Sequence, residues 1–125
     1  MKEYDPLSKP NPSEWLALDE PDQIAIVTAY HRADRMEVPN LQVHVMVHVV
    51  VENQLAERIE VAREALERLM AEGVDRHEAI HAIGSVLLEH MQNLMREKKA
   101  GSNPHERYFE DLRTLTVETR KQRTI

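Results

Sequence analysis

Residues 40–56 read NLQVHVMVHVVVENQLA, and this stretch decides the fold class. Five valines alternate along residues 43–51, which is the pattern of a β-strand. No other segment offers a good partner strand, and a lone strand leaves its backbone groups unpaired. The continuation from Glu52 to Ala56 is helical in character, and Asn40 is a residue type that caps helices. We therefore expect a helix over residues 40–56.

Capping signals outside this stretch predict further helices. Asp19, followed by Pro21, is suited to start a helix over residues 20–34. Asp75 with Glu78 three residues later forms a capping box, which starts a helix over residues 76–99. Asn103 and Pro104 start a last helix by the same logic, and we expect it to fray by about residue 120.

A helix running without a break from residue 40 to Gly73 would be about 50 Å long, too long for a chain of this size. We therefore predict a break between residues 56 and 60, although neither Gly nor Pro marks it. The segment after the break has apolar residues at helical spacing and forms a helix over residues 60–72. Its charged face, which includes Glu60, Glu64 and Arg68, is expected to face solvent.

The predicted fold is an all-α bundle of four to five helices with an extended N-terminal arm. The chain has 125 residues, which is the length of one domain. Three prolines among the first 12 residues favour an extended arm over residues 1–18, and Trp15 anchors this arm to the body. The helical domain then covers residues 19–119. The basic segment 120–125 is predicted to be disordered.

Composition excludes several functional classes. The formal net charge of −6 argues against nucleic acid as a partner, because binding phosphates takes a basic face. No apolar run is long enough to span a membrane, and the N-terminus lacks the apolar region of a secretory signal. A cytoplasmic, bacterial-type protein is expected. The chain has no cysteine, so any metal ion must be held by nitrogen and oxygen ligands.

Four of the seven histidines form two matching steps, His44-x-x-x-His48 and His77-Glu78-x-x-His81. On a helix, residues four apart lie on one face, one turn from each other, so each pair can share an ion. If helices 40–56, 60–72 and 76–99 run up, down and up, the first and third are parallel and begin at the same end of the bundle. The four imidazoles then lie at one level.

The leading hypothesis is therefore a transition-metal site between two helices. Its ligands are His44, His48, His77 and His81. Glu52, one turn deeper, is a fifth ligand or a carboxylate that orients one of the imidazoles. Zinc, nickel, iron and manganese all accept nitrogen and carboxylate ligands. His31 ends the preceding helix near the same level, and its role stays open.

Two other interpretations compete with this one. His77-Glu78-x-x-His81 is also the zinc-peptidase signature, with Glu78 as general base. The capping box already explains Glu78, however, and the motif opens a helix instead of lying in its middle. The second alternative is a metal-free interaction module or homo-oligomer, because a bundle with few aromatic residues often completes its core by dimerising. No reaction or substrate follows from these residues.

The two histidine segments resemble a small uncharacterised bacterial family of helical proteins, a domain of unknown function. The resemblance rests on an Asn-x-x-x-His-x-x-x-His-x-x-x-Glu-x-Gln-like segment, here residues 40–55, and on a later His-Glu-Ala-x-His helix, here residues 76–84. It covers roughly residues 20–98. Relatives of this kind have more Leu, Met and Ala in the first segment, which supports a helix there, and often Gly or Pro at residues 57–60. The resemblance implies a role for the histidines and no particular reaction.

Overall fold

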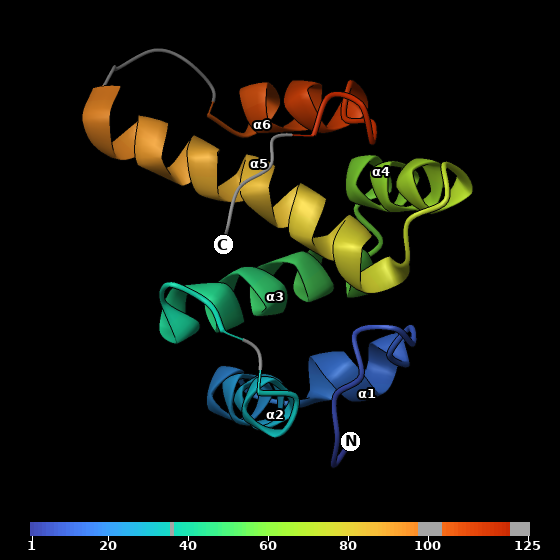
Figure 1. Ribbon diagram of the computed structural model, residues 1–125, viewed down its shortest axis with the longest axis vertical. Helices are drawn as coiled ribbons and strands as arrows, with labels where there is room; N and C mark the ends of the chain where they lie inside the picture. The colour runs from blue at the N-terminus through green and yellow to red at the C-terminus, as the bar shows by residue number, and fades with distance from the viewer. Residues whose placement is uncertain (36, 98–103, 121–125) are drawn as a thin grey trace.

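The computed structural model describes residues 1–35, 37–97 and 104–120, and within them it contains six helices and no strand. The predicted all-α fold is confirmed. Figure 1 shows α3 in the middle of the molecule, with α1 and α2 on one side and α4, α5 and α6 on the other. The helices are α1 (Pro12–Ala17), α2 (Glu20–Ala33), α3 (Leu41–Ala56), α4 (Glu60–Ala71), α5 (Arg76–Glu97) and α6 (Pro104–Arg113).

The alternating valines belong to a helix that is buried on two opposite sides. Residues two apart on a helix lie about 200° apart around its axis. Val45 and Val49 accordingly pack into one apolar cluster with Trp15 of α1, while Val47 and Val51 pack into the other, which spans α3 to α6. The pattern that imitates a strand therefore arises because α3 separates two cores.

Three of the four predicted caps are present, and the fourth, Asn103, lies outside the described residues. The side chains of Asp19, Asn40 and Asp75 accept hydrogen bonds from backbone N–H groups three residues later, at 3.1, 3.2 and 2.8 Å. The predicted break between α3 and α4 is also present. It is made by Arg58, which has φ of 60°, a left-handed conformation that lets the chain turn without a glycine.

The N-terminal arm contains one helix that we did not predict. Residues 1–11 are not helical, but α1 forms over Pro12–Ala17 within the segment expected to be extended. The side chain of Asn11 caps it, and Pro12 occupies its first position, where a missing N–H costs nothing. Trp15 anchors the arm as predicted: its side chain is fully buried and its indole N–H donates to Asn53 at 2.8 Å.

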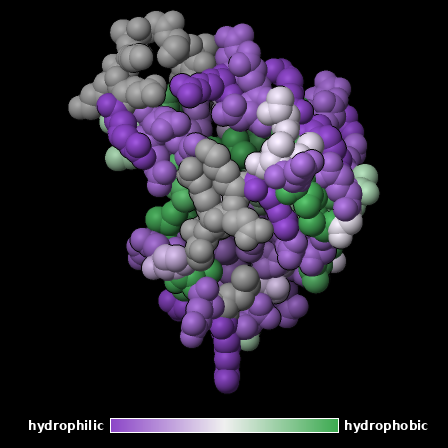
Figure 2. Space-filling model, turned by 45° about the horizontal axis from the view of Figure 1, so that its top comes forward, coloured by the Kyte–Doolittle hydropathy of each residue, from purple (hydrophilic) through white to green (hydrophobic). Residues whose placement is uncertain are grey.

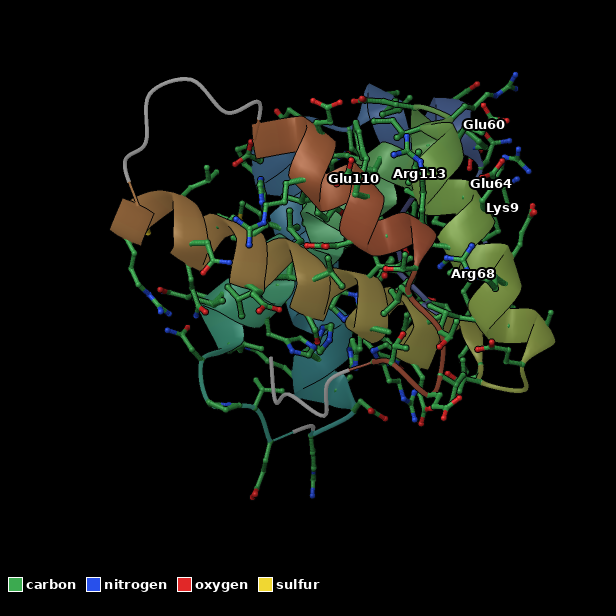
Figure 3. All side chains as sticks on the ribbon, turned by 90° about the horizontal axis from the view of Figure 1, so that it is seen from above. Lys9, Glu60, Glu64, Arg68, Glu110 and Arg113 are labelled. Carbon is green, nitrogen blue, oxygen red and sulfur yellow. The ribbon has the colours of Figure 1, made fainter. Side chains whose placement is uncertain are left out.

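The last helix is shorter than expected, because α6 ends at Arg113. Arg68 of α4 donates to the carbonyl oxygens of Leu112 and Leu115 at 2.6 and 2.9 Å, which satisfies backbone groups at this helix end. Figure 3 labels Arg68 on α4, the helix that packs against α6. Most of the predicted basic tail, residues 121–125, lies outside the described residues.

The arrangement of α3 and α5 differs from the expected one. Figure 1 shows α3 running from left to right and α5 from right to left, so the two helices cross instead of running parallel. They nevertheless pack against each other. The first turns of α5 still pack against the first half of α3, where His44 and His48 lie. The histidines of the two helices therefore meet.

The surface is mainly polar. Figure 2 shows a face that is largely hydrophilic with smaller hydrophobic areas. No helix among the described residues has the length and apolar content needed to cross a membrane.

A candidate metal centre formed by five histidines

Five histidines from three helices meet between α2, α3 and α5. His44 and His48 come from α3, and His77 and His81 from the first turns of α5, as the spacing predicted. His31, whose role the sequence left open, joins them from the last turn of α2. Each of the five offers one nitrogen, and all five nitrogens lie within 4.8 Å of one another. We call this group the histidine cluster.

The cluster is compact and mostly shielded from water. Ring centroids are 4.2 Å apart for His77 and His81, 4.6 Å for His31 and His44, and 5.0 Å for His48 and His81. The side chains of α2 and α3 are buried, whereas the two of α5 are partly exposed. The cluster therefore has a closed side on α2 and α3 and a side that water can reach on α5.

The hydrogen bonds of His31 determine which of its nitrogens is free to bind. Its Nδ1 lies 2.8 Å from the carbonyl oxygen of Val27, one turn earlier on α2. A carbonyl only accepts, so Nδ1 carries the proton and donates. Nε2 is then a lone pair, and it is buried without a hydrogen-bond partner. A buried lone pair without a partner lowers the stability of the fold unless a hydrogen-bond donor or a metal ion binds to it.

His48 is oriented by a chain of buried polar groups. The hydroxyl of Tyr4 donates to Glu52 Oε2 at 2.6 Å and lies 3.0 Å from His48 Nδ1. Because the only hydroxyl proton is used by Glu52, Nδ1–H of His48 donates to the Tyr4 oxygen. Nε2 of His48 is therefore a lone pair, and it faces Nε2 of His81 at 3.0 Å. This is how outer groups commonly orient a metal-binding imidazole.

Glu52 lies outside the histidine cluster, although the sequence placed it as a fifth ligand or an orienting carboxylate. Arg76 of α5 binds both of its oxygens, at 2.7 and 2.9 Å, and both side chains are buried. The carboxylate acts on His48 only through Tyr4. Glu52 is therefore linked to one imidazole of the cluster through Tyr4 and does not contact that ring itself.

Glu78 is also separate from the cluster. Its backbone N–H donates to the capping carboxylate of Asp75, and its exposed carboxylate lies 3.4 Å from Arg120. The general base that a peptidase mechanism would require is therefore directed to the surface.

Burial lowers the pKa of the clustered imidazoles, because a charged ring would lose its hydration. Burial, and after it the neighbouring histidines, lowers the pKa of His48 far below its ordinary value and that of His81 to about 3. Burial also lowers the pKa of His31 and of His77. These rings are neutral near pH 7, which is the form that binds metal ions.

Two residues of the site were missed in the sequence. Tyr4 lies in the proline-rich arm, 44 residues before His48, and nothing local indicates that it reaches the cluster. Arg76 directly precedes His77, so its position next to the site was visible. Its partner Glu52 lies 24 residues earlier, on α3, so the sequence does not show that these two side chains pair.

Fold and site together define an all-helical protein in which five imidazoles converge between three helices. Neither protein-family models nor curated proteins nor solved structures give a match to this chain. The resemblance to an uncharacterised bacterial family accordingly stays a prediction, and the functional argument rests on the geometry of the site.

Proposed function

We propose that this protein binds one transition-metal ion through the histidine cluster. The observation that carries the proposal is the convergence of five histidine nitrogens within 4.8 Å. Packing alone gives no reason for several imidazole nitrogens to converge on one point. A shared cation gives such a reason, because it binds to a lone pair on each nitrogen.

The donor set narrows the choice of metal. All five donors are nitrogens, and imidazole suits zinc, iron and nickel. Manganese, which was among the metals expected from sequence, prefers carboxylate and water oxygens. Zinc, nickel and iron are therefore the candidates we favour.

Metal analysis of protein purified without an affinity tag tests the proposal. After reconstitution and removal of excess ion, the wild-type protein should retain about one equivalent of a transition metal. Substituting both His77→Ala and His81→Ala should remove most of it. The matched control is His90→Ala, because His90 is also on α5 but stacks on Tyr108, with ring centroids 5.6 Å apart.

Two outcomes of this experiment would contradict the proposal. The first is wild-type protein with less than about a tenth of an equivalent after reconstitution. The second is equal metal loss in His90→Ala and in the double variant. A double variant with unchanged metal content and stability but lost self-association would favour the rival function, a metal-free interaction module.

Tyr4→Phe should weaken metal binding without removing a ligand. The change deletes the oxygen that accepts from His48 Nδ1–H, so the ring is no longer held in its binding orientation. We expect an affinity about 10–100-fold lower, measured by competition with a chromophoric chelator.

Tyr30→Phe is the control for Tyr4→Phe. The ring of Tyr30 also contacts the cluster, with its centroid 5.3 Å from that of His31, but its hydroxyl is not part of the chain to His48. If both variants bound metal as tightly as the wild type, the hydrogen bond from Tyr4 would have no role in orienting a ligand.

A further inference from the structure

No converging ligand of the histidine cluster carries a negative charge, and Asp34 and Asp75 act on His77 only from outside the set of ligands. Imidazoles bind as neutral ligands, so five of them leave the ion with its full charge. Among the described residues, the group of converging ligands contains only histidines. Glu52 does not supply the missing charge, because Arg76 already pairs with both of its oxygens.

An uncompensated charge in a largely buried site is costly. On the closed side, the carboxylate of Glu52 reaches the cluster only through Tyr4, and Arg76 already neutralises it. The partly exposed side of α5 is the route by which an anion from solution can reach the ion.

The spacing of the nitrogens also leaves room for another ligand. At a metal–nitrogen distance of about 2.1 Å, ligands at a right angle are about 3.0 Å apart, whereas tetrahedral ligands are about 3.4 Å apart. The two Nε2 atoms of His48 and His81 are 3.0 Å apart, the right-angle value. An octahedral ion has six ligand positions, so five histidine nitrogens would leave one position for another ligand.

We propose that the ion in the histidine cluster binds a small anion with an oxygen or nitrogen donor, such as a carboxylate or azide, which enters past His77 and His81. This inference rests on the proposed metal site. The anion completes the coordination and offsets the ion's charge. It is therefore the class of substrate or effector that the site would take.

Cobalt(II) makes the test direct, because its visible spectrum reports on its ligands. The probe is sodium azide, titrated at pH 8 into wild-type protein that has been loaded with cobalt and checked for cobalt content. We expect a saturable change of the spectrum with cobalt content unchanged. A cobalt-loaded protein whose spectrum does not respond to azide would overturn this inference alone. A protein that takes up no cobalt would overturn the metal site itself.

A matched pair of variants tests the charge argument. His77→Glu supplies a carboxylate within the cluster, whereas His77→Gln removes the imidazole without adding charge. The azide midpoint of the cobalt-loaded His77→Glu protein should be at least about tenfold higher than that of His77→Gln, a difference of about 1.4 kcal/mol. Equal midpoints would overturn the claim that the anion offsets the ion's charge. If neither variant binds cobalt, the azide titration of the cobalt-loaded wild-type protein decides whether the ion binds an anion.

Discussion

Replacing Glu52 by alanine should lower the free energy of unfolding of the metal-free protein by about 3–5 kcal/mol. The variant leaves the guanidinium of Arg76 buried without its carboxylate, and it also removes the acceptor of the Tyr4 hydroxyl. Both losses occur where water cannot replace the missing partner, as the exposures of 5% for the Arg76 side chain and 1% for that of Glu52 indicate. Urea unfolding of chelator-treated protein measures the effect.

Glu67→Ala is the matched control. Glu67 forms an ion pair of similar length with Arg63, 3.0 Å, but both side chains are about half exposed or more. Removing an exposed helical pair should change stability by less than about 1 kcal/mol. Adding Arg76→Met to Glu52→Ala should recover part of the loss, because deleting both charges removes the uncompensated one. Equal effects of the two alanine variants would mean that Arg76 finds another partner or reaches water.

The contrast between these two pairs explains why part of the site could not be predicted. Arg63 and Glu67 are four residues apart on one helix, which is a pattern that sequence reveals. Arg76 and Glu52 come from different helices, and Tyr4 joins them from the arm. Such contacts depend on how α3 and α5 cross, and we expected the two helices to be parallel. The histidines meet in spite of this difference, because the first turns of α5 cross α3 at His44 and His48.

Local capping signals predicted the starts of α2, α3 and α5. Asp19, Asn40 and Asp75 begin their helices as expected. The α1 helix was not predicted, although Asn11 and Pro12 form the same Asn-Pro pair as Asn103 and Pro104. The reason is that three prolines in the arm favour extended structure. The membership of His31 could not be decided from sequence, because it requires the angle at which α2 packs on α3.

The burial of neutral imidazoles has a consequence for pH that does not depend on metal. A histidine whose pKa is lower in the folded than in the unfolded protein binds fewer protons when folded. Its contribution to stability is therefore complete above the unfolded value of about 6.5 and is lost as the pH falls below it. The pKa of His31, His48, His77 and His81 is lowered in this way, so acid should favour unfolding.

Lowering the pH from 7 to 5 should therefore destabilise the metal-free protein by about 2 kcal/mol through the fully buried His48 alone, with further loss from the other rings. His81, whose pKa is lowered to about 3, should remain neutral in the folded protein at pH 5, so His81→Gln should flatten the pH dependence. Urea unfolding at both pH values measures this.

Bound metal adds a second dependence on pH in the same direction. An ion at a hundredfold excess over Kd stabilises the folded protein by about 2.7 kcal/mol, and protons compete with it for each imidazole. Because burial lowers the pKa of His81 to about 3, that competition should begin only at pH values well below 6.5. EDTA should therefore lower the melting temperature of the metal-loaded protein at pH 8 and still do so at pH 5. Loss of the EDTA effect already at pH 5 would show that the clustered imidazoles accept protons near their ordinary pKa.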